Sequence, residues 1–425
     1  MSTDTWSLLP PEIAIQIGYH NVDDAQTLRT MRLVSQEMRR ASTEPLFSVL
    51  GFYKEEDLVQ CSQVLRKTPA LAAAVNTVKM SVPLTGLSHP MLPCLHNVEE
   101  VHWSKNDPWD SGIARVYMVQ TFPSATRLVL RDVVFEHPSK FTLFLATCNP
   151  LRALDVQRCG SASPELVFVP KHVALDVSEL RDLTLVANSG WIKLPTMSSS
   201  GKLNLPTQLR TLKLLSDRDF IDVYIDESRD PCSLLMSILF LRFSASSLTQ
   251  LTINPHSSAR YANMALTNSS SACPSLTALT QMTFHIGILG GDTYASEVFF
   301  ASFTANTMPR LITLRFVSRI QGEDDEAGWF SHLFQSRVRE LHADSLRVKF
   351  PSLQTLVWAL RAATYAFRTT GTVPELARTA AYRETMERGL LRRLEEVGMG
   401  DAERLRSLVV IEWLDPMYRP LSLAE

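Results

Sequence analysis

From residue 47 onward, one six-residue pattern of apolar positions recurs along the chain: an apolar residue, two others, an apolar residue, one other, and a final apolar residue. Repeats of this pattern begin at residues 47, 75, 98, 125, 151, 180, 209, 248, 279, 311, 338, 353 and 405. Most successive starts lie 23 to 32 residues apart, as in 98 − 75 = 23 and 311 − 279 = 32. A period in this range is typical of solenoid proteins, in which each repeat packs against its neighbours.

The last three positions of each repeat alternate, so the fourth and sixth residues face the same side of a strand. Stacked repeats therefore predict one parallel sheet with a continuous apolar interior. Several repeats are preceded by an apolar residue and a proline, as at Phe122-Pro123 and Met308-Pro309. The step from 209 to 248 is 39 residues and predicts an insertion around 217–245.

Residues between the buried strand positions are expected on an exposed strand face. That face includes Glu100, His102, Arg127, Arg131, Asp155, Gln157, Asp182, Thr184, Lys213, Gln250 and Arg315. Their mixed charges suit a protein surface better than a phosphate backbone, so we expect a protein partner here. The alternative is that most of them are ordinary solvated strand residues.

After residue 358 the pattern becomes helical. Residues 359–370 and 375–398 are predicted as helices, and the second has an apolar face of Leu390, Leu391, Leu394 and Val397. Because the last repeat of a solenoid must be covered, these helices are predicted to form a C-terminal cap.

The first 45 residues have a different pattern, which predicts three short amphipathic helices. Pro11 suits the first helical position, where its missing N–H is not needed, and Glu12 suits the first turn. Asp23 or Asp24 can cap a second helix, and Ser35 a third. In the third helix, Arg39 and Arg40 are expected to point outward near its C-terminus.

The start of this segment leaves two alternatives open. Leu8, Leu9 and Pro10 either pack under the domain that follows or are offered to a partner. About 40 residues bury too little surface to fold well alone, so the three helices should pack on the rest of the chain or on another protein.

Composition narrows the function classes. The chain has 425 residues, 45% of them hydrophobic, and a formal net charge of −2, which gives no electrostatic footprint for nucleic acid or membrane. The beginning has no basic region or long apolar stretch, so no secretory signal is expected and the location is predicted to be cytoplasmic, nuclear or both. None of the six cysteines forms a Cys-x-x-Cys pair, and we expect free thiols and no metal or other cofactor.

The N-terminal residues resemble the F-box. That family has a Leu-Pro-x-Glu-Ile start, here Leu9 to Ile13, and a Leu-x-x-x-x-Leu-Val-Ser/Cys stretch, here Leu28 to Ser35. A basic or aromatic pair follows, here after Met38, where a tryptophan or phenylalanine is common in the family. The resemblance implies docking on the Skp-family adaptor of a cullin–RING ubiquitin ligase. The implied contact residues, shared with the segment's own small core, are Leu8, Leu9, Pro10, Ile13, Leu28, Leu33, Val34 and Met38.

The repeats resemble leucine-rich repeats, whose fuller pattern adds Asn or Cys three residues after the last apolar position. Cys159 and Asn188 meet it, and most repeats lack it. Together the resemblances imply an α/β protein with a three-helix F-box at 7–45, an irregular leucine-rich-repeat solenoid at 46–358, and a helical cap with a last repeat-like strand at 359–425. A fungal-type F-box protein of this kind recruits an unknown protein substrate for ubiquitination.

Two rival functions remain at this point. A leucine-rich-repeat scaffold without a ligase would keep the solenoid but need no partner for Leu9 and Pro10. An enzyme is the third reading, although the sequence has no phosphate-binding loop, no Gly-x-Ser-x-Gly turn and no His-Glu-x-x-His helix.

Overall fold

The computed structural model describes residues 10–21, 24–82, 91–104, 110–148, 150–162, 177–186, 206–215, 244–253, 275–286, 308–320, 350–362, 379–396 and 409–414. The protein is of the α/β class, and the described residues include eight α-helices and twelve parallel strands of an open sheet. The chain divides into two compact units. Unit 1 is Met1–Leu180 with Trp191–Asn204, unit 2 is Arg181–Gly190 with Leu205–Glu425, and each is described by itself.

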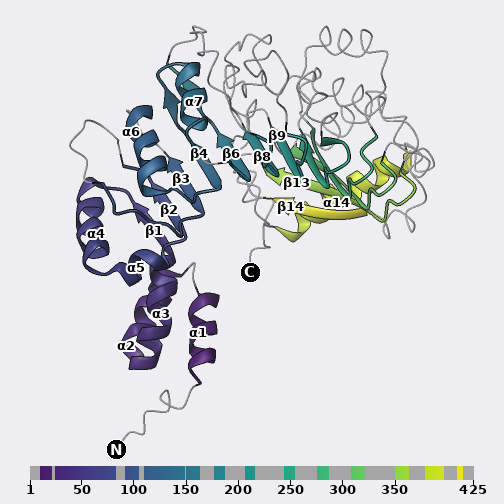
Figure 1. Ribbon diagram of the computed structural model, residues 1–425. Coiled ribbons are helices and arrows are strands. Elements are labelled where there is room, and N and C mark those ends of the chain that lie inside the picture. The colour runs from purple at the N-terminus through teal and green to yellow at the C-terminus, as the bar shows by residue number, and fades with distance from the viewer. Residues whose placement is uncertain are drawn as a thin grey trace, which may run out of the picture. The chain divides into compact units, whose positions relative to one another are not determined.

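Unit 1 begins with three helices, α1 (Pro11–His20), α2 (Ala25–Val34) and α3 (Gln36–Ser48). Helix α3 packs against both α1 and α2 and runs directly into the first strand (Figure 1). The predicted boundary between residues 45 and 46 therefore falls inside α3, which continues to Ser48 although Pro45 lies in it.

The strands of unit 1 lie side by side in chain order: β1 (Val49–Phe52), β2 (Thr77–Met80), β3 (Glu100–Ser104), β4 (Arg127–Arg131) and β6 (Ala153–Gln157). The connections between them contain α4 (Glu55–Lys67), α5 (Pro69–Ala74), α6 (Ser111–Val116), a π-helical turn (Tyr117–Thr121) and α7 (Pro138–Leu145). Figure 1 shows α4, α6 and α7 following one another along one face of these strands.

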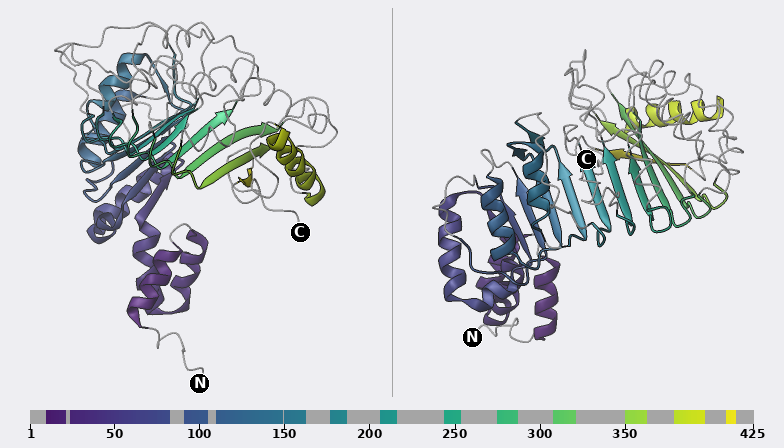
Figure 2. Two further views of the ribbon diagram at one scale, coloured as in Figure 1. Left: turned by 90° about the vertical axis from the view of Figure 1, so that its right-hand side faces the viewer. Right: turned by 45° about the horizontal axis from the view of Figure 1, so that its top comes forward.

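Unit 2 repeats this order with seven strands. They are β8 (Asp182–Val186), β9 (Thr211–Leu215), β10 (Gln250–Ile253), β11 (Gln281–Ile286), β12 (Thr313–Ile320), β13 (Thr355–Ala362) and β14 (Val409–Leu414). One helix of this unit is described, α14 (Ala380–Glu396), and it lies beside β14 in both views of Figure 2. Trp413 of β14 donates a hydrogen bond from Nε1 to Glu387 of α14 at 2.8 Å.

The repeated sequence pattern predicts the strands closely. In eleven repeats, those that begin at residue 47 through 311 and at 353, the strand starts at the third position of the pattern. Burial follows the prediction as well: in the repeat at 209, Leu209, Leu212 and Leu214 are buried. The apolar residue three positions before a repeat, such as Phe122 or Met308, is also buried, and its carbonyl accepts the N–H of the first position.

Within each unit, backbone hydrogen bonds join neighbouring repeats where the strands begin. The carbonyl of the second position accepts two N–H groups from the following repeat, for example Arg210 from Thr249 and Gln250, at 2.9 Å each. The same arrangement occurs from Asn76 to the repeat of Glu100, and from Ile312 to the repeat of Thr355. Backbone groups at this edge of the sheet are therefore satisfied within the protein.

Three predictions near the C-terminus need correction or lie outside the described residues. Residues 359–362 are the end of strand β13, not the start of a helix, because they pair in parallel register with β12. In the last repeat Val409, not Leu408, takes the fourth position, since it pairs with Leu356, and Val410 is exposed. The repeat at 338 lies outside the described residues, and β12 pairs directly with β13.

The predicted C-terminal helix is present as α14, in which Met386 and Leu390 are buried. Leu391 is half-buried, whereas the side chains of Leu394 and Val397 lie outside the described set, as do Asn188 and residues 217–243 of the insertion predicted at 217–245.

The two-residue strands β5 (Val134–Phe135) and β7 (Gly160–Ser161) were not predicted. They pair with each other after Asp132 and Arg158, which have positive φ angles of 54° and 50°. The Arg158 guanidinium holds both oxygens of Asp132, at 2.6 and 2.7 Å, across 26 residues of sequence. This bidentate ion pair fixes two neighbouring turns in the same conformation.

Candidate protein-binding surfaces

The three N-terminal helices bury a small core of their own. It contains Ala14, Leu28, Met31, Met38 and Ala41, with Ile17 and Leu46 packed partly against it. Leu28 and Met38, two of the expected adaptor-contact residues, are therefore core residues at 0% and 4% exposure. Their contribution to a partner surface is indirect, since they hold the helices together.

The remaining apolar residues of this segment are exposed. Leu33 is 82% exposed, Ile13 42% and Val34 40%, and Pro10 is exposed as well. Ile15 and Tyr19 of α1 add further exposed apolar area. Leu8 and Leu9, the first two of the expected contact residues, lie outside the described residues. Three of the eight expected contact residues are thus apolar side chains exposed on α1 and α2.

Local sequence signals position these helices. Pro10 is extended, with φ −54° and ψ 137°, and Pro11 takes the first position of α1 as predicted. Asp24 caps α2, because its carboxylate accepts hydrogen bonds from the backbone N–H and the hydroxyl of Thr27. These hydrogen bonds lower the pKa of Asp24. Ser35 caps α3, because its hydroxyl accepts from the Met38 N–H at 3.1 Å.

The two predicted outward arginines lie at the start of α3, not at its C-terminus, because that helix runs on to Ser48. Arg39 donates from Nε to the carbonyl of Arg32 at 3.1 Å, so it caps the C-terminus of α2 instead.

The exposed strand face of unit 1 carries the predicted charged residues in close pairs. Glu100 contacts His102 Nε2 at 3.0 Å and Arg127 Nε at 3.8 Å. On the next strands, Asp155 accepts from Gln157 at 2.8 Å and lies 4.0 Å from Arg131. Burial lowers the pKa of His102, an effect that Glu100 opposes and Lys79 and Arg131 reinforce.

This face has a small positive excess. Lys79, Arg127 and Arg131 are cationic, Glu100 and Asp155 are anionic, and His102, with its lowered pKa, is neutral at pH 7. The excess is one charge (3 − 2 = 1), so the surface is mixed rather than strongly basic.

In unit 2 the exposed strand face is richer in uncharged polar residues. Thr211, Gln250 and Gln281 share one register row, and Lys213, Thr252 and Thr283 share the next. Asp182 and Thr184 begin the same two rows on β8. Arg315, predicted as a binding residue, is held in an ion pair with Glu412 across 97 residues of sequence. This pair could not be predicted from the sequence, because the register of β14 had to be known first.

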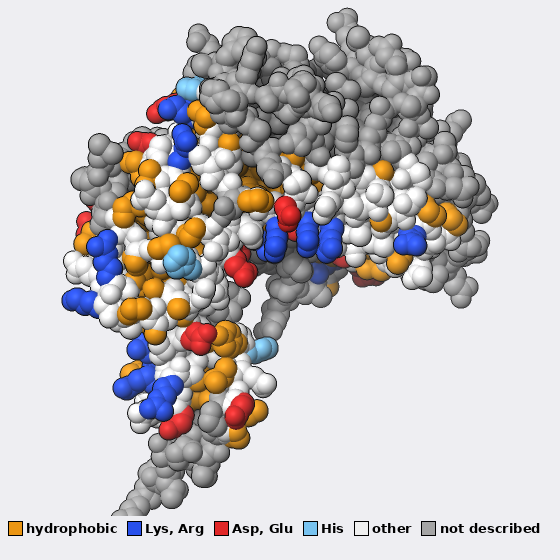
Figure 3. Space-filling view, in the orientation of Figure 1, with side chains coloured by type: hydrophobic (Ala, Val, Ile, Leu, Met, Phe, Trp, Pro, Cys, Tyr) orange, Lys and Arg blue, Asp and Glu red, His pale blue; other side chains and the backbone are white. Residues whose placement is uncertain are grey.

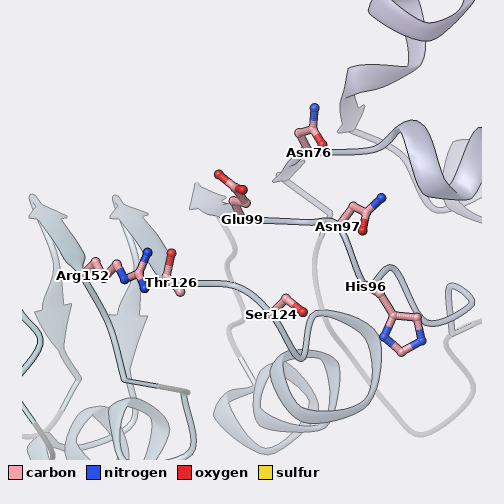
Figure 4. Close-up of a pocket in the computed structure, with 7 residues that line it drawn as sticks. All are labelled: Asn76, His96, Asn97, Glu99, Ser124, Thr126 and Arg152. Carbon is pink, nitrogen blue, oxygen red and sulfur yellow. The ribbon is translucent and has the colours of Figure 1, made fainter.

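A polar hollow of about 400 Å³ lies along the strand-entry loops of unit 1. Its lining is shown in Figure 4 and consists of Asn76, His96, Asn97, Glu99, Ser124, Thr126 and Arg152. The Arg152 guanidinium lies beside the Thr126 side chain, and His96 is set apart on another loop (Figure 4). None of these residues was singled out from the sequence, because they come from four different repeats.

The described residues contain no group of three or more His, Cys, Asp or Glu side chains that could hold a metal ion. Cys61, Cys94, Cys148 and Cys159, the cysteines within those ranges, are free thiols. Burial raises the pKa of Cys159 to about 12, and its Sγ donates to the carbonyl of Gln157. A search of the same ranges for a helix with the length and hydropathy to span a membrane finds none.

Comparison with known proteins adds no assignment: no family model matches the chain, and no curated protein matches it.

Proposed function

We propose that this protein is the substrate-recognition subunit of a Skp–cullin–F-box ubiquitin ligase. In this role α1–α3 are an F-box that binds the Skp-family adaptor, and the parallel strands are a leucine-rich-repeat solenoid that binds a target protein. The protein itself catalyses no reaction and holds no cofactor. Its contribution is proximity, because the bound target is kept near the ubiquitin-carrying enzyme.

The observation that carries the proposal is the division of apolar residues in α1–α3. The helices bury Leu28, Met31 and Met38 in their own core, yet leave Ile13, Leu33 and Val34 exposed. These exposed positions belong to the two sequence stretches that resemble the F-box. Apolar side chains left exposed on a small helical segment favour a protein-binding surface, and Figure 3 shows hydrophobic side chains at the surface of these helices.

The strand faces support the target-binding half of the proposal. Parallel strands that follow chain order present one row of side chains per register position, and here those rows are polar and of mixed charge. Such a surface favours a protein partner, since paired charges at an interface select the partner and set its orientation.

The test is adaptor binding by the full chain, measured by isothermal titration with purified Skp-family adaptor. Leu33→Asp should weaken binding more than about tenfold, because a charge would replace an apolar contact worth ~2 kcal/mol at an interface. Leu33 is 82% exposed, so the substitution leaves the core of α1–α3 intact.

Val64→Asp is the matched control, since Val64 is an exposed apolar residue (43%) on helix α4, outside the three N-terminal helices. Equal weakening by both variants would mean that the effect is not local to α1–α3. No binding by the folded wild-type chain would remove the ligase assignment and favour the second candidate, a repeat scaffold that binds a partner without a ligase.

A further inference from the structure

Arginine occupies the same position in three successive repeats. The repeats at 151, 180 and 209 all begin Leu-Arg, so that Arg152, Arg181 and Arg210 are the second residues and are spaced 29 residues apart. In the structure this second position lies at the strand-entry edge, just before the strand begins. The backbone carbonyl at this position accepts hydrogen bonds from the next repeat, as in Arg181 and Arg210, and the side chain takes no part in those bonds.

Two of these arginines are neighbours within unit 2. Strands β8 and β9 pair with Asp182 opposite Thr211, so Arg181 and Arg210 immediately precede matched positions. Arg210 N–H donates to the carbonyl of Arg181 at 2.7 Å. Adjacent parallel strands are ~4.8 Å apart, so two positive side chains start from neighbouring backbone positions.

Both side chains are at least partly exposed to solvent. Arg210 is exposed and Arg181 half-buried, and neither guanidinium forms an ion pair with a described residue. Glu179 and Asp182 flank Arg181 in sequence, yet neither forms an ion pair with it. Like charges on neighbouring strands oppose each other, so the arrangement destabilises the free protein unless an anion lies between them.

We infer that Arg181 and Arg210 form a site for a single oxyanion group, the carboxylate or phosphoryl group of an acidic residue on the target protein. Two guanidinium groups that start from neighbouring strands offer enough N–H donors for the several oxygens of such a group. The inference rests on the proposed function only for the source of the group, a bound target. It adds a contact with the target at the strand-entry edge, beside the strand face.

The size of the site excludes a longer polyanion. Along the same row, the positions after Arg210 are Thr249, Thr280, Ile312 and Gln354, all uncharged. Within unit 2 the cationic stretch is therefore only two strands wide, and the chain carries a net charge of −2. A nucleic acid backbone needs many cations in a line for useful affinity, whereas one carboxylate or phosphate needs two.

The experiment is an NMR titration of the full chain, selectively labelled with ¹⁵N-arginine, with inorganic phosphate, acetate or chloride at matched ionic strength. The Nε–H signals of Arg181 and Arg210, assigned from the single Arg→Gln variants, should shift with saturation in phosphate. Saturation by acetate as well would identify a carboxylate as a sufficient ligand, and saturation by phosphate alone would identify a phosphoryl group.

Arg181→Gln with Arg210→Gln should weaken phosphate binding at least tenfold, as read from the signals of the remaining arginines and by calorimetry. The charge-matched control, Lys54→Gln with Lys67→Gln, removes two exposed cations at the ends of helix α4 in unit 1 and should leave it unchanged. Non-saturating shifts, equal saturation by chloride, or equal loss in the control would overturn the inference. Adaptor binding by the double arginine variant separates this result from the ligase assignment, because that binding depends on α1–α3.

Discussion

Gly18 determines at the residue scale how closely α1 approaches α3. A Cβ atom at this position would lie 2.6 Å from the backbone oxygen of Ala41, closer than real Cβ contacts allow. The F-box family often has a leucine where this chain has residues 18–22, and in the structure Gly18 lies in the last turn of α1. The close approach of the two helices gives a packing reason for the glycine that the sequence alone did not supply.

Gly18→Ala should therefore separate α1 from α3 and destabilise the three-helix segment by about 1–3 kcal/mol, the usual cost of overpacking. Hydrogen exchange of the α1 backbone in the full chain measures this directly, and faster exchange is expected. Gly51→Ala is the matched control, since its Cβ would meet only the Tyr53 ring at 3.2 Å, and that side chain is exposed and can move. Unchanged exchange in Gly18→Ala would show that α3 shifts without cost.

Capping residues show how much of the local structure is readable one residue at a time. Ser35 is a helix cap, as predicted. Of the two aspartates predicted as alternatives for the other cap, Asp24 forms it. Such signals depend on neighbours within three residues, so no tertiary information is needed to find them. The Asp132–Arg158 pair joins residues 26 apart in sequence, and only the stacking of repeats brings them together.

At the element scale, the short apolar pattern predicts where the strands lie but not the residues at which they end. Strands β12 and β13 continue to Ile320 and Ala362, beyond the last apolar position of their repeats. Each gains length by pairing with the other over eight residues. Strand length is thus decided by the neighbouring strand, which the pattern within one repeat does not contain.

The C-terminal helix α14 is attached to β14 mainly through Trp413. That side chain is 6% exposed, contacts the Tyr382 ring at 6.1 Å, and has the Arg383 guanidinium 5.3 Å from its centroid. With the hydrogen bond to Glu387, two successive turns of α14 contact one residue of the last strand. The described part of α14 therefore lies beside the last described strand of unit 2.

Trp413→Ala should release α14, because loss of a buried tryptophan costs about 3–5 kcal/mol. The measurement is protease sensitivity of the full chain, with new cleavage expected inside α14 while unit 1 stays protected. Val410→Ala in the same strand is the control. Val410 is 47% exposed, so its truncation removes little buried surface. A helix that stays protected in Trp413→Ala would mean that Met386 and Leu390 hold it without the tryptophan.

At the scale of the whole molecule, the two compact units allow binding and stability to be separated. The N-terminal helices lie in unit 1, and strands β8–β14 in unit 2. In repeat architectures each repeat depends on its nearest neighbours, so damage to one strand spreads to adjacent strands before distant ones.

Leu251→Ala in β10 should therefore loosen unit 2 without removing adaptor binding. Leu251 is 1% exposed, and truncation of a buried leucine costs about 2–5 kcal/mol. Hydrogen exchange should increase first in β9, β10 and β11, while the adaptor titration curve stays that of the wild type. Loss of adaptor binding in this variant would show that the units do not act independently.

The sequence by itself determined the features that depend on short range: the period of the repeats, the alternation of buried positions in most strands, and the helix caps. Each of these follows from residues within a few positions of one another. It also yielded the resemblances on which the ligase proposal is built.

The tertiary structure decided everything that depends on which residues far apart in sequence become neighbours. It assigned Leu28 and Met38 to a core while leaving Leu33 exposed, turned residues 359–362 into strand, paired Arg315 with Glu412, and brought Arg181 beside Arg210. The physical reason is that register between strands, and contact between helices, is set by packing across 25 to 100 residues of chain, as in the pairs separated by 26 and 97 residues.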